Sequence, residues 1–206
     1  MERIKKWIGI LSIMFGLFIM ALLFTYRTDY DTPTPPRIDR YEKVKQYEPM
    51  LRAELRKYHL EEYTLTLLAL MHQESRGEGG DPMQASESAG LPPNTINDPA
   101  WSIRQGVKHF NDVLTYGAKK KVDFPTVIQA YNMGKGYIDF IAAHGKKHTE
   151  ELAKQYSAIQ VKKEPNVYNC GEDRNNFRYP YCYGDFSYTT KVLQKRERIK
   201  NTMEAS

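Results

Sequence analysis

A run of apolar residues that ends in a single carboxyl group constrains the fold of this chain more than any other stretch. Residues 65–84 read LTLLALMHQESRGEGGDPMQ, and the apolar side chains recur at helix-face spacing up to Met71. Glu74 follows three residues later, so it prolongs the apolar stripe instead of joining a solvated face. Three glycines come directly afterwards and favour an end to the helix. The pattern predicts a helix whose last turn holds a carboxyl group against apolar neighbours, facing a cleft.

A carboxyl group in that setting is expected to have a raised pKa, because its charged form loses solvation among apolar side chains. A raised pKa keeps the group protonated near neutral pH, as a general acid requires. The alternative is that Glu74 is an ordinary polar residue near the end of a helix and faces water. Motifs elsewhere in the chain favour the first interpretation.

Three short motifs follow one another along the chain: Glu-Ser at 74–75, Met-Gln at 83–84 and AYNMG at 130–134. In this order they resemble the signature of the lysozyme-like glycosidases that cut bacterial cell-wall glycan, the lytic transglycosylases and the related muramidases. The resemblance extends over about residues 41–193 and includes a closing segment, YGD at 183–185 with Tyr188 just beyond it. It implies a mainly α-helical, lysozyme-like domain with a substrate cleft.

One departure from the family pattern is informative. In the commoner soluble transglycosylases, a longer insert and a Gly-Leu or Gly-Ile pair precede Met-Gln. Here Asp81 and Pro82 occupy that place, only a few residues after Glu74. The departure favours the muramidase branch of the resemblance. As a whole, the chain most resembles the small lysozyme-like domain of bifunctional and membrane-anchored wall enzymes of Gram-positive bacteria.

Asp81 is the candidate for a second catalytic carboxylate. Glycoside cleavage requires one protonated acid, here Glu74, and a second carboxylate can stabilise or attack the sugar centre. On a continuous helix the seven residues between them would span about 10 Å, whereas a retaining pair needs a separation of roughly 5 Å. The intervening glycines allow the loop to fold back and shorten that distance. The alternative is structural, because Asp before Pro often opens a turn and bonds its own backbone.

Five further residues are candidates for substrate binding. Gln84 and Ser86 resemble residues that line the sugar site of the family, and Glu87 is a third carboxyl group within reach. Tyr131 and Asn132 resemble the family's cleft-facing pair. A tyrosine can stack on a sugar face or hydrogen-bond near the acid, although an ordinary apolar helix position is the alternative for Tyr131.

The N-terminus predicts the compartment. Residues 7–26 contain no charged side chain and are mostly Ile, Leu, Phe and Met, which is about the length of a membrane-spanning helix. Arg3, Lys5 and Lys6 precede the run and should keep the short N-terminus in the cytoplasm. A cleaved signal peptide is the alternative, but the run is long for one and no clear cleavage site follows. We therefore expect an uncleaved anchor in the cell membrane and a C-terminal domain outside the cell, facing the wall.

The rest of the chain divides by composition. Proline, threonine and aspartate after the anchor predict a stiff, extended spacer. The expected parts are a cytoplasmic stub at 1–6, the anchor at 7–26, the spacer at 27–40, the catalytic domain at 41–200 and a tail at 201–206. Helical patterns within the domain, with no convincing strand, cover about 41–58, 61–74, 98–116, 123–131, 136–143, 149–160 and 188–200.

The charge excludes one class of partner. The net charge is +5, and residues 1–6 contribute +2 of it, so the remainder is only +3. This balance is not typical of a nucleic-acid-binding protein. No phosphate-binding loop or catalytic Ser-His-Asp set is present in the sequence, and the His144/His148 pair lies in a lysine-rich turn, so we expect neither a cofactor nor a metal site.

Cys170 and Cys182 are the two cysteines of the chain. Outside the cell, an even number of cysteines close in sequence predicts a disulfide. Two free buried thiols are the alternative. No basic surroundings point to a reactive thiol, so we expect a structural bridge.

These observations predict a membrane-anchored, extracellular peptidoglycan glycosidase that cuts the β-1,4 bond between N-acetylmuramic acid and N-acetylglucosamine. A muramidase would use Asp81 and water, whereas a lytic transglycosylase would need Glu74 alone and would give an anhydro product. A catalytically silent wall-binding or scaffold module is the third interpretation, with protein partners that the sequence does not identify.

Overall fold

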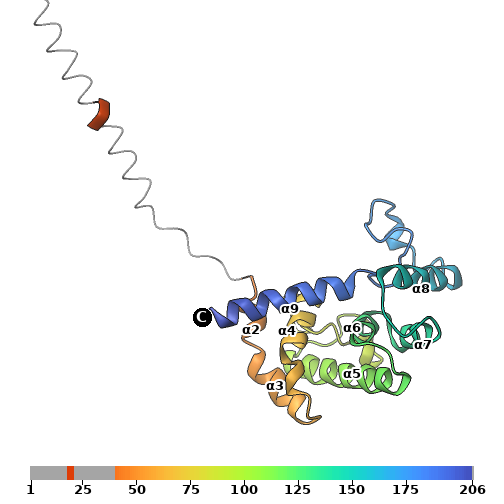
Figure 1. The fold of residues 1–206 in the computed structure, drawn as a ribbon, viewed down its shortest axis with the longest axis horizontal. Helices are drawn as coiled ribbons and strands as arrows, with labels where there is room; N and C mark the ends of the chain where they lie inside the picture. The colour runs from red at the N-terminus through yellow and green to blue at the C-terminus, as the bar shows by residue number, and fades with distance from the viewer. Residues whose placement is uncertain (1–17, 21–39, 206) are drawn as a thin grey trace, which may run out of the picture. The chain divides into compact units, whose positions relative to one another are not determined.

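The computed structural model describes residues 18–20 and 40–205 (Figure 1). Apart from residues 18–20, which are helical, the predicted membrane anchor lies outside the described residues, as do the stub at 1–6 and the spacer up to residue 39. None of the helices in the described part of the chain is long and apolar enough to cross a membrane. Residues 39–206 form a compact unit, which is considered by itself below.

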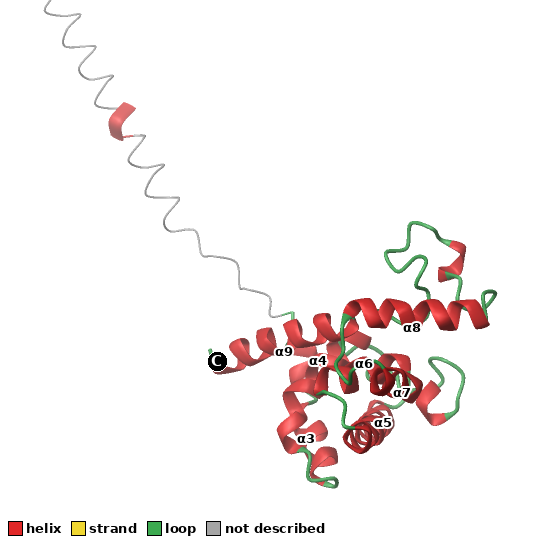
Figure 2. Ribbon diagram, turned by 45° about the vertical axis from the view of Figure 1, so that its right-hand side comes forward, coloured by secondary structure: helices red, strands yellow, loops and turns green. Residues whose placement is uncertain are grey.

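This unit is built from helices and loops, and the part of it that the structure describes contains no strand (Figure 2). The predicted mainly α-helical class is therefore confirmed. Three of the elements are single 3-10 turns. In chain order the elements are α2 (Glu42–Lys45), α3 (Glu48–Arg56), η1 (Glu61–Tyr63), α4 (Thr64–Glu74), η2 (Glu87–Ala89), α5 (Pro99–Lys120), α6 (Phe124–Met133), α7 (Lys135–Ala143), α8 (Glu150–Lys163), η3 (Cys170–Glu172) and α9 (Tyr188–Glu204).

Three predicted helix starts are confirmed by capping hydrogen bonds. Asp98 accepts a bond from the amide of Ala100 at the start of α5, and Asp123 accepts one from the amide of Thr126 at the start of α6. Thr149 caps α8 in the same way. A side-chain oxygen before a helix satisfies an amide that has no partner in the first turn. The expected break at Gly134 also occurs, between α6 and α7.

The prediction of one continuous helix over 41–58 was wrong. The segment forms α2 and α3, which are separated by Gln46 and Tyr47. Pro49 lies in the first turn of α3, where its missing amide proton costs nothing; further inside a helix the ring would clash with the preceding turn. The helix therefore restarts just before Pro49. At the other end of the chain, α9 continues to Glu204, so most of the predicted tail is helical.

Helix α4 lies at the centre of the core. Residues 67–71 are fully buried, so other parts of the protein cover every face of this section of the helix and not only its apolar face. Helix α9 packs along α4, and α3 packs against it as well (Figure 1). This arrangement places Glu74, the last residue of α4, beside the N-terminal part of α9.

Candidate active site

Glu74 lies at the junction of α4 and α9. Its side chain is half-buried, and its Oε1 accepts a hydrogen bond from the hydroxyl of Tyr188, the first residue of α9. Burial raises the pKa of Glu74 to about 7, against the opposing effect of the Tyr188 hydrogen bond. The negative charges of Asp81, Asp185 and Glu87 raise it further. Glu74 is therefore a carboxyl group that is substantially protonated at neutral pH.

The loop after α4 folds back as the glycines suggested. The hydroxyl of Ser75 donates a hydrogen bond of 2.7 Å to the carbonyl of Pro82 and accepts one of 3.0 Å from the amide of Gly77. Gly77 has φ +77°, and a Cβ there would lie 3.1 Å from Val44. Glycine fits this position because it tolerates a positive φ and has no Cβ to crowd Val44. The fold-back brings the Asp81 segment alongside the end of α4.

Asp81 is buried, with 4% of its surface exposed, and each of its two carboxylate oxygens accepts two hydrogen bonds. Oδ1 accepts from the amide of Ala85 at 2.9 Å and the hydroxyl of Ser102 at 2.7 Å. Oδ2 accepts from the amide and hydroxyl of Ser86 at 3.1 and 2.6 Å. Burial alone would raise the pKa of Asp81, but these hydrogen bonds outweigh it and hold the pKa below its ordinary value. Asp81 is thus an ionised residue that organises its own loop.

Two serines complete that loop. Ser86 is 1% exposed, and its hydroxyl also accepts the amide of Ile96 at 3.0 Å. The hydroxyl of Ser102 on α5 accepts the amide of Met83 at 2.9 Å. Ser86, a predicted substrate-binding residue, is thus placed beneath the surface as a partner of Asp81. Ser102 was not predicted, since a serine on an amphipathic helix has no distinctive sequence signal.

Gln84 and Glu87 lie on the surface of the same loop. Gln84 is exposed, and its side-chain amide donates a hydrogen bond of 3.1 Å to the carbonyl of Asp81. Glu87 is exposed at the start of η2, close enough to Glu74 for its charge to raise the Glu74 pKa. Both side chains are exposed, and Glu87 lies near Glu74.

The third family motif, AYNMG, lies on α6 and contacts the loop after α4. Tyr131 is buried, and its hydroxyl donates to the carbonyl of Met83 at 3.2 Å. Burial raises the pKa of Tyr131 well above its ordinary value, and the charges of Glu74 and Asp81 add to the rise. Its ring contacts His109 edge-on. Tyr131 therefore joins the loop after α4 to α6, behind the exposed side chains.

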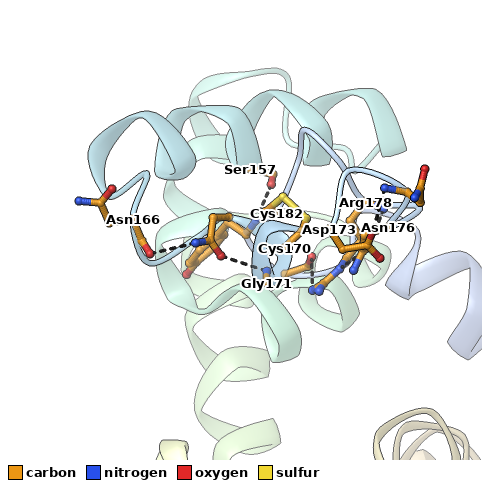
Figure 3. Close-up of a disulfide and its surroundings, with 12 residues drawn as sticks. Ser157, Asn166, Cys170, Gly171, Asp173, Asn176, Arg178 and Cys182 are labelled. Atoms are coloured by element: carbon orange, nitrogen blue, oxygen red, sulfur yellow. Dashed lines mark hydrogen bonds between the residues drawn. A yellow bond between two sulfur atoms is a disulfide. The ribbon is translucent and has the colours of Figure 1, made fainter.

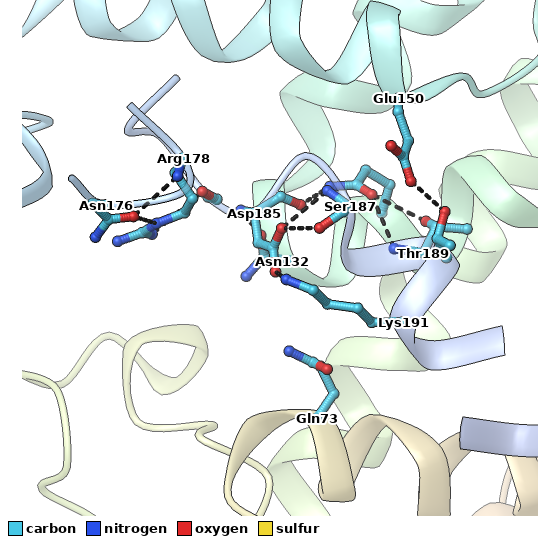
Figure 4. A network of polar contacts seen from close by, with 12 residues as sticks. Gln73, Asn132, Glu150, Asn176, Arg178, Asp185, Ser187, Thr189 and Lys191 are labelled. Atoms are coloured by element: carbon cyan, nitrogen blue, oxygen red, sulfur yellow. Dashed lines mark hydrogen bonds and ion pairs between the residues drawn. The ribbon is translucent and has the colours of Figure 1, made fainter. Parts of the chain in front are cut away.

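Asn132 connects α6 with the start of α9. Its Oδ1 accepts the amide of Asp185 at 2.7 Å, and Figure 4 shows Asn132, Ser187 and Lys191 converging on Asp185. The Asp185 carboxylate accepts both the amide and the hydroxyl of Ser187, and it pairs with Lys191 at 2.6 Å. A Cβ on Gly184, which has φ +63°, would lie 2.7 Å from Asn132 Oδ1. The network fixes the N-terminal end of α9 and with it Tyr188.

The predicted disulfide is present between Cys170 and Cys182 (Figure 3). The next residue, Tyr183, donates its amide to the hydroxyl of Ser157 on α8 at 3.0 Å. Its own hydroxyl donates to the carbonyl of Met133 at 3.0 Å. The closed loop is thereby held against α8 and against the end of α6, next to Asn132.

The two histidines considered for a metal point to different partners. Nδ1 of His144 lies 2.6 Å from the carbonyl of Phe140, and Nδ1 of His148 lies 2.7 Å from the hydroxyl of Tyr137. Within residues 18–20 and 40–205, no group of three or more histidine, cysteine or acidic side chains is placed to hold a metal ion.

Comparison with known proteins places this site in a family. The family model described as Lysozyme-like matches residues 41–196. The chain is 47% identical over 190 residues to the "Uncharacterized membrane protein YocA" of Bacillus subtilis, covering 92% of this chain and 84% of that protein. It is 41% identical over 149 residues to the "Pneumococcal vaccine antigen A" of Streptococcus pneumoniae, covering 72% and 69% respectively.

Two longer proteins match in part. The chain is 42% identical over 129 residues to the "Bifunctional muramidase/DL-endopeptidase CwlT" of Bacillus subtilis, covering 62% of this chain and 34% of that protein. A crystal structure from Staphylococcus aureus, described as similar to a lipoprotein of the NLP/P60 family, superposes with a TM-score of 0.65 at 36% identity. That match covers 75% of this chain and 52% of the other.

Proposed function

The chain belongs to the lysozyme-like family, and from this premise we propose that it is a membrane-anchored peptidoglycan glycosidase. It acts outside the cell on the β-1,4 bond between N-acetylmuramic acid and N-acetylglucosamine. The muramidase named among its relatives supports peptidoglycan hydrolysis. The relative named as a membrane protein and the uncharged run at residues 7–26 support the anchor.

The observation that carries the proposal is the raised pKa of Glu74, about 7, at a site where three family motifs meet. The protonated carboxyl group donates its proton to the glycosidic oxygen as the bond breaks and an oxocarbenium-like sugar centre forms. The Tyr188 hydroxyl occupies Oε1, which leaves Oε2 for the substrate. The negative charges of Asp81 and Asp185 nearby favour the positive centre electrostatically.

The nucleophile distinguishes two versions of the reaction. In a muramidase, Asp81 stabilises or attacks the sugar centre, and water then completes the cleavage as Glu74 accepts its proton. In a lytic transglycosylase, the 6-hydroxyl of the sugar attacks instead. The four hydrogen bonds that fill both oxygens of Asp81 favour this second candidate, because direct attack by Asp81 would require breaking them. Gln84, Glu87, Tyr131 and Asn132 then position the glycan, the last two mainly by holding the loops around Glu74.

Digestion of purified Gram-positive cell walls by the full-length protein in detergent tests the proposal. Mass spectrometry of the released muropeptides separates the two products, since a reducing end and an anhydro end differ by one water. Glu74→Gln is expected to lower the rate by about 10²- to 10⁴-fold. Glu78→Gln is the matched control, because Glu78 is exposed on the same loop and pairs only with Lys43 among the contacts described. Wall binding by the unmutated protein without any release of muropeptides would instead support the silent binding module.

A further inference from the structure

The loop between α8 and α9 presents aromatic side chains to solvent. Phe177 is 61% exposed, although it belongs to a loop that the Cys170–Cys182 disulfide closes. Its ring lies 6.1 Å from that of Phe186, which in turn lies 6.0 Å from that of Tyr181. We call Phe177, Tyr181 and Phe186 the aromatic platform. Tyr181 and Phe186 are half-buried, so Phe177 is the ring of the platform that a ligand can cover.

The platform is tied to the proposed catalytic site through a lysine. Nζ of Lys191 lies 4.1 Å from the centroid of the Phe177 ring, which is a cation–π contact, and 2.6 Å from Asp185 Oδ2. Asp185 in turn donates its amide to Asn132 and raises the pKa of Glu74 by its charge. Phe177 is therefore connected, through Lys191 and Asp185, to the residues around Glu74.

The closed loop is anchored well enough to act as a fixed surface. Tyr168 and Tyr183 meet edge-to-face at 4.8 Å, and the guanidinium of Arg178 donates to the carbonyl of Gly184 at 3.3 Å. Lys154 on α8 lies 4.9 Å from the ring of Phe186. Because these contacts brace the loop internally and join it to α8, Phe177 can bind a ligand without first being ordered.

We propose that the aromatic platform is a further glycan subsite, on which a sugar of the wall strand beyond the cleaved pair stacks against Phe177. The apolar C–H face of a pyranose ring gains by covering an exposed aromatic face. The ammonium of Lys191 covers one face of the Phe177 ring, so the sugar stacks on the opposite, exposed face. The subsite rests on the proposed function, and it makes long strands better substrates than short fragments.

The test uses the full-length protein with Glu74→Gln as background, so that glycan survives during binding. Affinity is measured for long glycan strands freed of peptides and for the disaccharide that spans only the cleaved pair. Adding Phe177→Ala is expected to weaken binding of long strands about tenfold, the loss of one stacked ring, and to leave disaccharide binding unchanged. Phe177→Tyr, which keeps the ring, should stay within about twofold.

Tyr58→Ala is the matched control, because Tyr58 is another exposed aromatic, just past the C-terminal end of α3. In Figures 1 and 2, α3 and the disulfide loop lie at opposite ends of the domain. An unchanged affinity for long strands in Phe177→Ala, or an equal loss for both lengths, would overturn the subsite. Failure of the proposed function gives a different result: the unmutated protein would then release no muropeptides, with or without a change at Phe177.

Discussion

The hydroxyl of Tyr188 donates a hydrogen bond to Oε1 of Glu74, a residue 114 positions earlier in the chain. The contact exists because α9 packs along α4 and brings its own first residue beside the last residue of α4. The bond stabilises the ionised form of Glu74 and so opposes the effect of burial on its pKa. Tyr188 therefore sets how far that pKa can rise, and it orients the carboxyl group.

Replacing Tyr188 with Phe is expected to shift the pH dependence of cleavage. The hydrogen bond lowers the pKa of Glu74, so its removal raises the pKa above about 7. Since the acid must be protonated, the alkaline limb of the kcat profile should move to higher pH by about one unit. Tyr137→Phe is the control, because it removes a buried hydroxyl that bonds His148 and not Glu74. An alkaline limb that stays in place, or moves to lower pH, would contradict this role for Tyr188.

Glu74→Gln is expected to stabilise the fold at alkaline pH. The pKa of Glu74 rises from an ordinary value of 4.5 to about 7 on folding, so ionisation opposes the folded state. The loss of folding stability caused by this ionisation is absent below pH 4.5. It grows as the pH rises to 7 and then stays constant at about 3 kcal/mol. Denaturant unfolding at pH 4 and pH 8 measures it. The variant should exceed the unmutated protein in stability only at pH 8, and equal stabilities at both pH values would argue against burial of the charge.

Asp81→Asn and Ser102→Ala test whether Asp81 organises the loop or attacks the sugar. Each change removes hydrogen bonds within the buried group around Asp81, so each should lower the free energy of unfolding by about 1–3 kcal/mol and reduce cleavage in parallel. Ser88→Ala, on an exposed serine of the same segment, serves as control. Loss of cleavage in Asp81→Asn with unchanged stability, and normal cleavage in Ser102→Ala, would instead assign Asp81 a chemical role.

Alanine substitutions at two glycines with the same backbone conformation separate the cost of backbone strain from the cost of steric crowding. Gly171 and Gly184 have φ of +67° and +63°, but an added Cβ meets nothing within 4 Å at Gly171, whereas at Gly184 it would lie 2.7 Å from Asn132 Oδ1 and 2.8 Å from Met133. Alanine should cost about 1 kcal/mol of stability at Gly171. At Gly184 it should cost at least about 1 kcal/mol more and lower cleavage, because Asn132 must move. Equal effects on stability and cleavage would show that the close approach to Asn132 is unimportant.

The sequence predicted helix boundaries correctly where they depend on contacts between residues close together in the chain. The starts at Asp98, Asp123 and Thr149 each depend on a hydrogen bond to an amide two or three residues later. The break at Gly134 was predicted for the same kind of reason. The continuous helix expected over 41–58 failed even though Pro49 was a visible signal, because the apolar pattern continues across the two helices that form.

The sequence by itself determined that Glu74 ends a buried apolar helix before a glycine-rich loop, and that Cys170 and Cys182 are close enough in the chain to pair. Only the tertiary structure decided what surrounds that carboxyl group. Tyr188 reaches it, and Ser102, 21 residues after Asp81, occupies an oxygen of the neighbouring carboxylate. Such bonds join residues far apart in sequence and form only when α4, α5 and α9 pack together, so no local pattern of residues specifies them.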